Sequence, residues 1–458
     1  MESGVNSLGI LELETYDVSR KTKLAMNSST CLRPLLARPE AAAMWLALTA
    51  VPMLALPQAA RAQDTGITDL GGLGGWSAAN GVSGDGSVVV GVAYDSTSDE
   101  DHAFRWTAAG GMQDMGGLNG GGWAWANGVS SDGSVVVGTA TDGVSGQDRA
   151  FRWTEAGGME SLGTLGHGIS SSATAVSFDG AVVVGHSNDV EEGGYDYAFR
   201  WTVADGMVSL GTLNGGQASV AYGVSADGSV VVGSAADGAF GNDERAFRWT
   251  ETGGMVSLGT LNGSGYSQAT GVSFDGTVVV GGSADGASGN FGRAFRWTET
   301  GGMVSLGTIN GGNYSWANGV SADGAVVVGE ATDGASGNAV HAFRWTKAGG
   351  MQSVEDWLIG SGIDVAADLQ TKVANGTNTD GSVVVGQLQN DHAFIARVAK
   401  EGGGLVTLED LQASLAATAG GGAMILRSSD LLITGAHSRP LSRRVEGGKN
   451  TFWMTGDW

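Results

Sequence analysis

Cysteine is almost missing from this 458-residue chain, in which Cys31 is the only one. Cys31 lies in an N-terminal segment that has the features of a removable export signal. A mature chain without a thiol excludes a disulfide framework, cysteine-ligated zinc, an iron–sulfur cluster and a cysteine nucleophile. The same absence suits a chain that passes through an oxidising compartment.

Positive charge is also scarce, since Lys and Arg number 24 against 47 Asp and Glu. Between Gln63 and Gly420 the imbalance is greater, with 13 basic and 39 acidic residues. Phosphate binding requires the opposite sign of charge, so the composition excludes a nucleic-acid partner. A solvated, exported surface fits this charge better.

Long apolar runs are missing except near the N-terminus. There, a basic start at Arg33 is followed by the apolar stretch Ala41–Leu56 and by the small-residue sequence A-A-R-A. This order predicts a secretory signal peptide that is cleaved after about Ala62. The alternative is a membrane anchor, but a membrane-spanning helix needs about 20 apolar residues.

A helical hydrophobic period is missing as well, and a long repeat stands in its place. The motif A-F-R-W-T occurs six times, at intervals of 47, 48, 48, 48 and 48 residues. Its phenylalanines are Phe104, Phe151, Phe199, Phe247, Phe295 and Phe343. Each repeat reads L-G-T-L-N-G-G, a loop, G-V-S-x-D-G-S-V-V-V-G, a second loop, A-F-R-W-T and x-x-G-G-M-V-S. Four short β-rich runs between Gly, Asp and Asn turn signals predict a four-stranded meander.

The Asp-Gly pair inside each repeat is predicted to form a hairpin turn. Glycine tolerates positive φ there, and aspartate can accept a hydrogen bond from its own turn. The seven aspartates are Asp85, Asp132, Asp179, Asp227, Asp275, Asp323 and Asp380. The alternative is that they serve as calcium ligands or form an acidic ring.

Strand patterns within a repeat predict which side chains fill the core. The run Val135–Val137 puts apolar side chains on both faces of one strand, so this strand is expected to be covered on both sides. Alternation places Phe151 and Trp153 on one face of the next strand, as a wedge between neighbouring sheets. Arg152 faces the other way. We expect such arginines to be compensated by the turn aspartates or by nearby carbonyls.

The repeat number predicts the architecture. V-V-V-G occurs seven times, and repeats of 40 to 50 residues with four strands each are typical of a β-propeller. The predicted fold is therefore an all-β, seven-bladed propeller, and the alternative is a β-solenoid. A lone strand at Ile67 precedes the first repeat and would complete the last blade. The segment Leu405–Leu411 is the alternative for that place.

Two segments resemble known families. The recurring H-A-F and A-F-R-W-T units, over Ile67–Arg397, resemble the bacterial extracellular HAF-repeat family. The tail Leu432–Trp458 resembles the junction that opens the outer-membrane β-barrel of autotransporters. This resemblance implies an adhesin-like passenger at the cell surface or outer membrane, or in the extracellular space, with a surface protein or glycan of a host or neighbouring cell as partner. The chain itself holds too few strands for a barrel, so we expect a fragment or a truncated gene.

These observations divide the chain into four segments. Residues 1–62 hold an N-terminal extension and the signal peptide, with translation starting at Met1 or Met26. Residues 63–400 are the predicted propeller. Residues 401–438 are a linker, and residues 439–458 are the start of the missing barrel.

Ligand sites are predicted on the variable loops. The loops after L-G-T-L carry aromatic residues that could stack on a sugar or a protein, namely Trp123, Trp125, Tyr222, Tyr266, Tyr314 and Trp316. The alternative is that these rings pack over the ends of the blades. The acidic loops Asp95–Asp101 and Asp189–Asp196 could bind calcium or simply be solvated. No other cofactor or metal site is expected.

Two classes of function remain: a non-catalytic interaction module, and a glycan-active hydrolase on a propeller. S-x-D-G is similar to the Asp-box turn of sialidases, but here it continues as V-V-V-G. The histidines near the second loop are His102, His186, His341 and His392. The sequence pairs none of them with a serine nucleophile or a metal-ligand spacing, so no catalytic residue is predicted.

Overall fold

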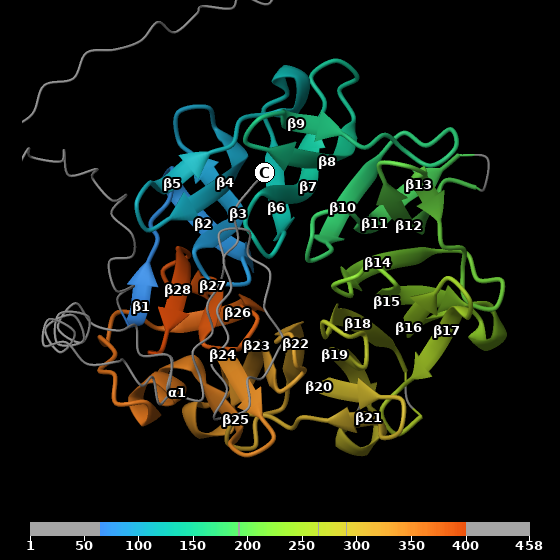
Figure 1. Cartoon of the computed structure of the whole chain (residues 1–458). Helices are drawn as coiled ribbons and strands as arrows, with labels where there is room; N and C mark the ends of the chain where they lie inside the picture. The colour runs from blue at the N-terminus through green and yellow to red at the C-terminus, as the bar shows by residue number, and fades with distance from the viewer. Residues whose placement is uncertain (1–64, 191–192, 264, 290, 400–458) are drawn as a thin grey trace, which may run out of the picture. The chain divides into compact units, whose positions relative to one another are not determined.

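The computed structural model describes residues 65–399 except 191, 192, 264 and 290. Within these residues, 28 strands form seven four-stranded antiparallel sheets, which are arranged as blades in a ring (Figure 1). Each sheet follows the chain as a meander, so one 48-residue repeat supplies most of one blade. The prediction of a seven-bladed β-propeller is confirmed, and the β-solenoid alternative is wrong.

The strands occupy the same four places in every blade. The inner strands, nearest the centre of the ring, are β2 (Gly74–Val82), β6 (Ala124–Val129), β10 (Ser171–Val176), β14 (Ser219–Val224), β18 (Ser267–Val272), β22 (Ser315–Val320) and β26 (Thr371–Thr377). The second strands are β3 (Val88–Asp95), β7 (Val135–Thr141), β11 (Val183–Asp189), β15 (Val230–Asp237), β19 (Val278–Asp285), β23 (Val326–Asp333) and β27 (Val383–Leu388).

The third strands carry A-F-R-W-T or its degenerate form. They are β4 (Glu100–Thr107), β8 (Asp148–Thr154), β12 (Tyr195–Thr202), β16 (Asp243–Thr250), β20 (Phe291–Thr298), β24 (Ala339–Thr346) and β28 (Ala393–Arg397). The outer strands are β5 (Gly111–Asp114), β9 (Gly158–Ser161), β13 (Gly206–Ser209), β17 (Gly254–Gly259), β21 (Gly302–Ser305), β25 (Gly350–Ser353) and β1 (Gly66–Asp69). One short helix, α1 (Val354–Gly360), follows β25.

The seventh blade joins the two ends of the described chain. Its strand order is β1-β28-β27-β26, so the N-terminal strand pairs with the last strand. The pairing is antiparallel and runs from Gly66 opposite Arg397 to Asp69 opposite Phe394. The prediction that the strand at Ile67 completes the last blade is confirmed. The alternative strand, Leu405–Leu411, lies outside the described residues.

The core lies between the blades, where the A-F-R-W-T phenylalanines act as wedges. All six phenylalanines are fully buried. Phe151, for example, packs in one cluster with Val88, Val90 and Ala103 of the preceding blade. Burial of one such side chain contributes about 1.5–3 kcal/mol. The valines of V-V-V-G are also buried, so the predicted two-sided covering of their strand is confirmed.

The S-x-D-G turns are held by their own side chains. In the fourth blade, Asp227 Oδ1 accepts hydrogen bonds from Ser225 Oγ at 2.7 Å and from the Ser229 amide at 3.0 Å. Ser225 Oγ in turn accepts from the buried Val230 amide at 2.9 Å. The same contacts recur at Asp85, Asp132, Asp179, Asp275 and Asp323. The turn prediction for these aspartates is therefore confirmed.

These turns meet around one end of the central channel, which we call the turn end. The amide of the second residue of each turn, S-x-D-G in six blades and N-T-D-G in the seventh, donates to the carbonyl of the equivalent residue in the next blade, at 2.9–3.3 Å. The seven residues are Gly84, Ser131, Phe178, Ala226, Phe274, Ala322 and Thr379. The last amide, of Thr379, donates to the carbonyl of Gly84, which closes the circle. One unbroken ring of seven main-chain hydrogen bonds thus links all the blades.

The A-F-R-W-T arginines are compensated by carbonyls of the neighbouring turn. Arg200 Nε donates to the Gly228 carbonyl at 3.2 Å, from one blade to the next. Arg248, Arg296 and Arg344 make the equivalent bond. In the first two blades, by contrast, the buried Nε atoms of Arg105 and Arg152 have no hydrogen-bond partner among the described residues. The arginines were expected to pair with the turn aspartates or with nearby carbonyls, and in the third to sixth blades the structure shows hydrogen bonds to carbonyls.

Candidate functional site

The other end of the channel, which we call the loop end, is formed where the loops after L-G-T-L enter the inner strands. A cavity of about 540 Å³ opens there, and it shares Asn127, Thr174, Tyr222 and Thr270 with the lining of the central channel. Its lining comes from the inner strands β6, β10, β14 and β18, with further side chains from β7, β8 and β11. A cavity of this size is within the usual range for a small-ligand site.

The cavity lies where the third and fourth blades carry the small residues Ser170 and Ala218 at the start of the inner strand. Where the inner strand begins, four blades carry an aromatic residue, namely Trp76, Trp123, Tyr266 and Tyr314. The third blade carries three consecutive serines, Ser170–Ser172, at and after this position, and all three line the cavity. Small side chains in place of large rings leave space between the blades.

Trp123 and Trp125 form one wall of the cavity. Their ring centroids are 5.5 Å apart and the rings are tilted by 36°. Trp125 is 37% exposed, and its Nε1 donates to Asp101 Oδ2 at 3.3 Å. The two indoles thus present apolar faces to a ligand, while the polar edge of one is fixed by a carboxylate.

Tyr222 lies at the base of the cavity, where it interrupts another inter-blade ring. Each inner strand has a β-bulge, and in six blades the bulged side chain donates to a carbonyl of the next blade at 2.7–3.0 Å. These residues are Asn80, Asn127, Thr174, Thr270, Asn318 and Asn375. In the fourth blade the bulged residue is Tyr222, which instead makes side-chain hydrogen bonds with Ser234 and Gln268. Burial raises the pKa of its phenol.

The imidazole of His186 is part of the cavity lining. It lies on β11, and its Nδ1 is buried without a hydrogen-bond partner among the described residues. Burial lowers the pKa of His186, although the charge of Asp196 acts in the opposite direction. The imidazole is therefore neutral at neutral pH, and it can form hydrogen bonds without carrying a charge.

Hydroxyls and one carboxylate complete the lining. Thr139 Oγ1 and Ser172 Oγ are 2.6 Å apart, one on each side of the gap between the second and third blades. Asp148 accepts a hydrogen bond from Thr141 Oγ1 at 2.9 Å. Among the described residues that line the cavity, Asp148 is the only one that carries a charge at neutral pH. The cavity can therefore stack a flat apolar face and hydrogen-bond several polar groups.

The structure separates the six predicted aromatic residues into two groups. Trp123, Trp125 and Tyr222 line the cavity. Tyr266, Tyr314 and Trp316 pack against the fifth and sixth blades instead: the rings of Tyr266 and Trp316 are stacked 6.1 Å apart, and Tyr314 OH donates to Glu330 Oε1 at 3.1 Å. Trp316 lies directly over Gly282, where any side chain would collide with its ring.

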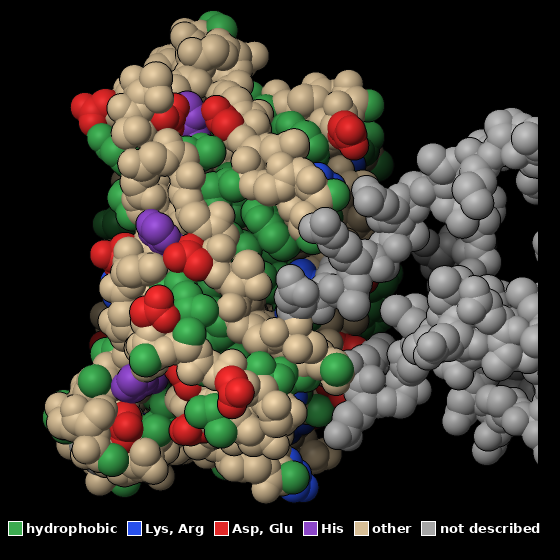
Figure 2. Space-filling model, turned by 90° about the vertical axis from the view of Figure 1, so that its left-hand side faces the viewer, with side chains coloured by type: hydrophobic (Ala, Val, Ile, Leu, Met, Phe, Trp, Pro, Cys, Tyr) green, Lys and Arg blue, Asp and Glu red, His purple; other side chains and the backbone are tan. Residues whose placement is uncertain are grey.

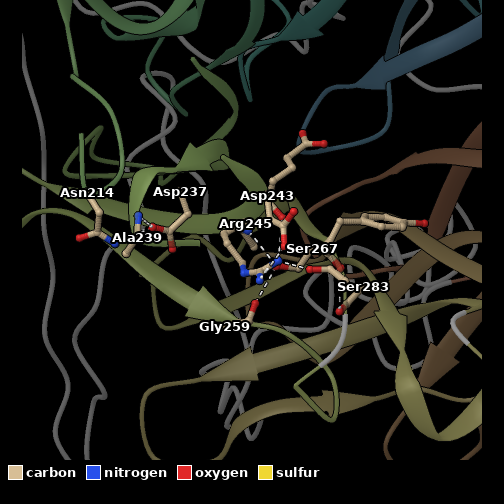
Figure 3. A network of polar contacts seen from close by, with 12 residues as sticks. Asn214, Asp237, Ala239, Asp243, Arg245, Gly259, Ser267 and Ser283 are labelled. Atoms are coloured by element: carbon tan, nitrogen blue, oxygen red, sulfur yellow. Dashed lines mark hydrogen bonds and ion pairs between the residues drawn. The ribbon is translucent and has the colours of Figure 1, made fainter. Parts of the chain in front are cut away.

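Polar contacts hold the loops around the loop end (Figure 3). In the fourth blade, Asn214 Nδ2 donates to Asp237 Oδ1 at 2.8 Å, and the Ala239 amide donates to the same oxygen at 3.0 Å. Between the fourth and fifth blades, Ser267 Oγ donates to the Gly259 carbonyl at 2.6 Å. Asn119, Asn262 and Asn310 repeat the contact of Asn214. The same Asn–Asp hydrogen bond therefore fixes the loop in each of these four blades.

The acidic loops use their carboxylates within the protein. Asp95 Oδ1 accepts from the Thr97 amide at 2.8 Å, and Asp99 Oδ1 accepts from Tyr94 OH at 2.5 Å. Part of Asp189–Asp196, residues 191 and 192, lies outside the described residues. Within the described ranges, no group of three or more His, Cys, Asp or Glu side chains is placed to hold a metal ion. Calcium binding stays a prediction.

One histidine does meet a serine, which the sequence did not reveal. Ser98 Oγ lies 3.0 Å from His102 Nε2, and His102 Nδ1 lies 2.9 Å from Asp114 Oδ2. The contact forms because the turn after β3 folds Ser98 back over β4, and no repeated sequence pattern signals it. The seventh blade has the same His–Asp pair, His392 and Asp69, at 3.0 Å. In both blades the pair ties the outer strand to the third strand.

The surface agrees with the acidic composition. In Figure 2, Asp and Glu side chains are spread over the visible face, whereas Lys and Arg side chains are few. In the part of the chain that the structure describes, no helix has the length and apolar character needed to cross a membrane.

Comparisons with known proteins bear on the fold. No protein-family model and no curated protein matches the chain. The chain is similar to TolB from Acinetobacter baumannii, at 18% identity and a TM-score of 0.36, over 52% of this chain and only 53% of that protein. It is also similar to an oligogalacturonate lyase in complex with manganese, at 14% identity and a TM-score of 0.49, over 73% and 93% of the two chains.

A third similar structure is the oligogalacturonate lyase from Vibrio parahaemolyticus, at 11% identity and a TM-score of 0.45, over 74% of this chain and 96% of that one. At such identities and TM-scores the likeness extends to neither activity, ligand nor metal. The chain is an all-β protein built as a seven-bladed propeller.

Proposed function

We propose that this propeller is an exported, adhesin-like interaction module, displayed as a passenger at the cell surface, and that its ligand binds in the loop-end cavity. The observation that carries this proposal is the local break in the repeat. Ser170–Ser172, the exposed Trp125 and the imidazole of His186 line this cavity together. The counterpart of Trp125 in the sixth blade, Trp316, packs over Gly282 instead.

Export and display rest on the sequence. The predicted signal peptide and the tail that resembles an autotransporter junction both lie outside the described residues. The acidic surface supports a solvated exported domain. The partner would be a protein or glycan on a host or neighbouring cell.

Cell attachment tests the proposal directly. The purified full chain, labelled with a fluorophore, is incubated with a panel of bacterial and animal cells. We expect Trp123→Ala combined with Trp125→Ala to lower attachment at least tenfold. Trp316→Ala is the matched control, because Trp316 has the same place in its inner strand as Trp125 but packs over Gly282. Equal attachment by the wild type and the double variant would refute the cavity as the ligand site.

A hydrolase is the second candidate, and Ser98, His102 and Asp114 are the observation that favours it. A serine, a base and an orienting carboxylate within hydrogen-bond distance are the parts of an acyl-transfer site. The cavity itself offers less, because glycoside hydrolysis usually needs two carboxylates and its described lining holds one. Hydrolysis of p-nitrophenyl acetate, lost in Ser98→Ala and kept in Ser145→Ala, would establish this activity. Equal rates in wild type and Ser98→Ala would reject it.

A further inference from the structure

We infer that the cavity selects a neutral saccharide and discriminates against acidic sugars. This inference rests on the proposed function, because it names the ligand class of the same cavity. Three features of the lining carry it: the shape of the aromatic wall, the sign of the charge, and the pairing state of the polar groups.

The aromatic wall fits the apolar face of a sugar ring. The indoles of Trp123 and Trp125 are 5.5 Å apart and tilted by only 36°, so together they form a shallow, continuous surface. A pyranose ring presents a face of C–H groups that can lie flat on such a surface, with its hydroxyls pointing outward. Trp125 is held in place by Asp101, so little side-chain freedom is lost on binding.

The charge around the wall excludes acidic ligands. Asp148 lines the cavity and Asp101 lies behind Trp125, whereas no Lys or Arg is among the described residues that line the cavity. The nearest arginine on the same strand, Arg149, already donates to the carbonyls of Asp148 and Ile169. A sugar carboxylate would therefore enter beside the Asp148 carboxylate, which carries charge of the same sign.

The polar groups match the alternating donors and acceptors of sugar hydroxyls. The hydroxyls of Thr139 and Ser172 satisfy each other with one hydrogen bond and keep further capacity. His186 adds its imidazole, and Asp148 adds acceptor oxygens. A neutral hydroxyl can both donate and accept, so it can pair with each of these groups without burying a charge.

Binding of defined saccharides to the full chain tests the inference. Maltose, cellobiose, N,N′-diacetylchitobiose and, as the acidic probe, an oligogalacturonate are titrated in physiological salt. Trp123 and Trp125 lie in the wall, so quenching of tryptophan fluorescence reports binding, and calorimetry confirms it. We expect at least one neutral disaccharide to bind, and the oligogalacturonate to bind at least tenfold more weakly.

Substitutions in the lining test whether the measured saccharide binding takes place in the cavity. Trp125→Ala is expected to weaken binding of the neutral disaccharide at least tenfold, whereas the control Trp316→Ala leaves it unchanged within twofold. Asp148→Asn is expected to narrow the difference between neutral and acidic sugars. Circular dichroism checks that each variant is folded.

The outcomes separate the inference from the proposed function. Preferential binding of the oligogalacturonate, or binding of no neutral sugar by a chain that still attaches to cells through Trp125, would overturn the saccharide assignment and leave the module intact. Attachment to cells that is indifferent to Trp123 and Trp125 would overturn the proposed ligand site, and with it both statements.

Discussion

The two ends of the central channel are built from the same inner strands but differ in regularity. At the turn end, seven equivalent residues form a closed ring of hydrogen bonds, and every blade contributes in the same way. At the loop end, the bulge ring is interrupted at Tyr222, and serines open a cavity beside the third blade. The contacts of the turn end are thus repeated around the ring, whereas the cavity is confined to one part of the loop end.

The difference also separates two uses of the same residue type. Trp316 stacks over Gly282 and fills space, and its counterpart Trp125 is exposed at a cavity. In the first blade, Val92 stands where the fifth blade has Gly282, so Trp125 cannot pack inward as Trp316 does. Gly282 therefore gives Trp316 a surface to pack on that Trp125 lacks.

The largest effect is expected at the turn-end glycines. Gly228 has φ +71°, and a Cβ there would lie 2.4 Å from Cγ2 of Val182 in the neighbouring blade. Gly228→Ala should lower the free energy of unfolding by about 2–4 kcal/mol, because strain at positive φ and the collision add. Gly254, with φ +65° and open space around it, is the control. Chemical denaturation should show about 1 kcal/mol for Gly254→Ala, and equal losses would contradict the packing between blades.

The next effect concerns the turn serines. Ser225→Ala removes the acceptor of the buried Val230 amide and a donor to Asp227, so it should cost about 1–3 kcal/mol of unfolding free energy. Ser229 also donates to Asp227, but it is exposed. Ser229→Ala should therefore cost less than about 0.5 kcal/mol. If urea denaturation gave the reverse order, the turn would not be held by Ser225.

A smaller effect distinguishes the arginines of neighbouring blades. Arg200 donates to the Gly228 carbonyl, whereas Arg152 Nε has no partner. Arg200→Met should lower the unfolding free energy by about 1 kcal/mol, and Arg152→Met should have almost no effect or a stabilising one. Thermal denaturation of the two variants measures this difference. A larger loss for Arg152→Met would show that hydrogen bonding does not set the contribution of these arginines.

Lowering the pH should reduce the free energy of unfolding by a small amount for each of these turns. The Ser229 amide and the Ser225 hydroxyl hold the pKa of the Asp227 carboxyl below its ordinary value. Its contribution to stability is therefore present above pH 4 and is lost as the pH falls through the lower, folded-state pKa. Asp227→Asn should show a shallower loss of stability between pH 5 and pH 2 than the wild type. Parallel curves would mean that Asp227 ionisation is not linked to folding.

The sequence predicts the regular part of this molecule and little of the irregular part. The 48-residue period, the Asp-Gly turns and the alternation around Phe151 determine the blade, since each is a local pattern. The cavity depends on contacts between blades, which no single repeat contains. Ser170 was a visible signal, because it stands at a position that is aromatic in four blades. The contact between Ser98 and His102 had no such signal, because it depends on how one turn folds back.

The pairing of β1 with β28 has a mechanical consequence. Gly66 and Arg397 are opposite each other in an antiparallel pair, so the chain enters and leaves the propeller at the same end of that pair. A pulling force applied through both chain ends would break these hydrogen bonds one after another, beginning at the pair of Gly66 and Arg397. It would not load them all at once in shear. The seventh blade would then yield at low force, and the six continuous blades would resist until the ring had opened.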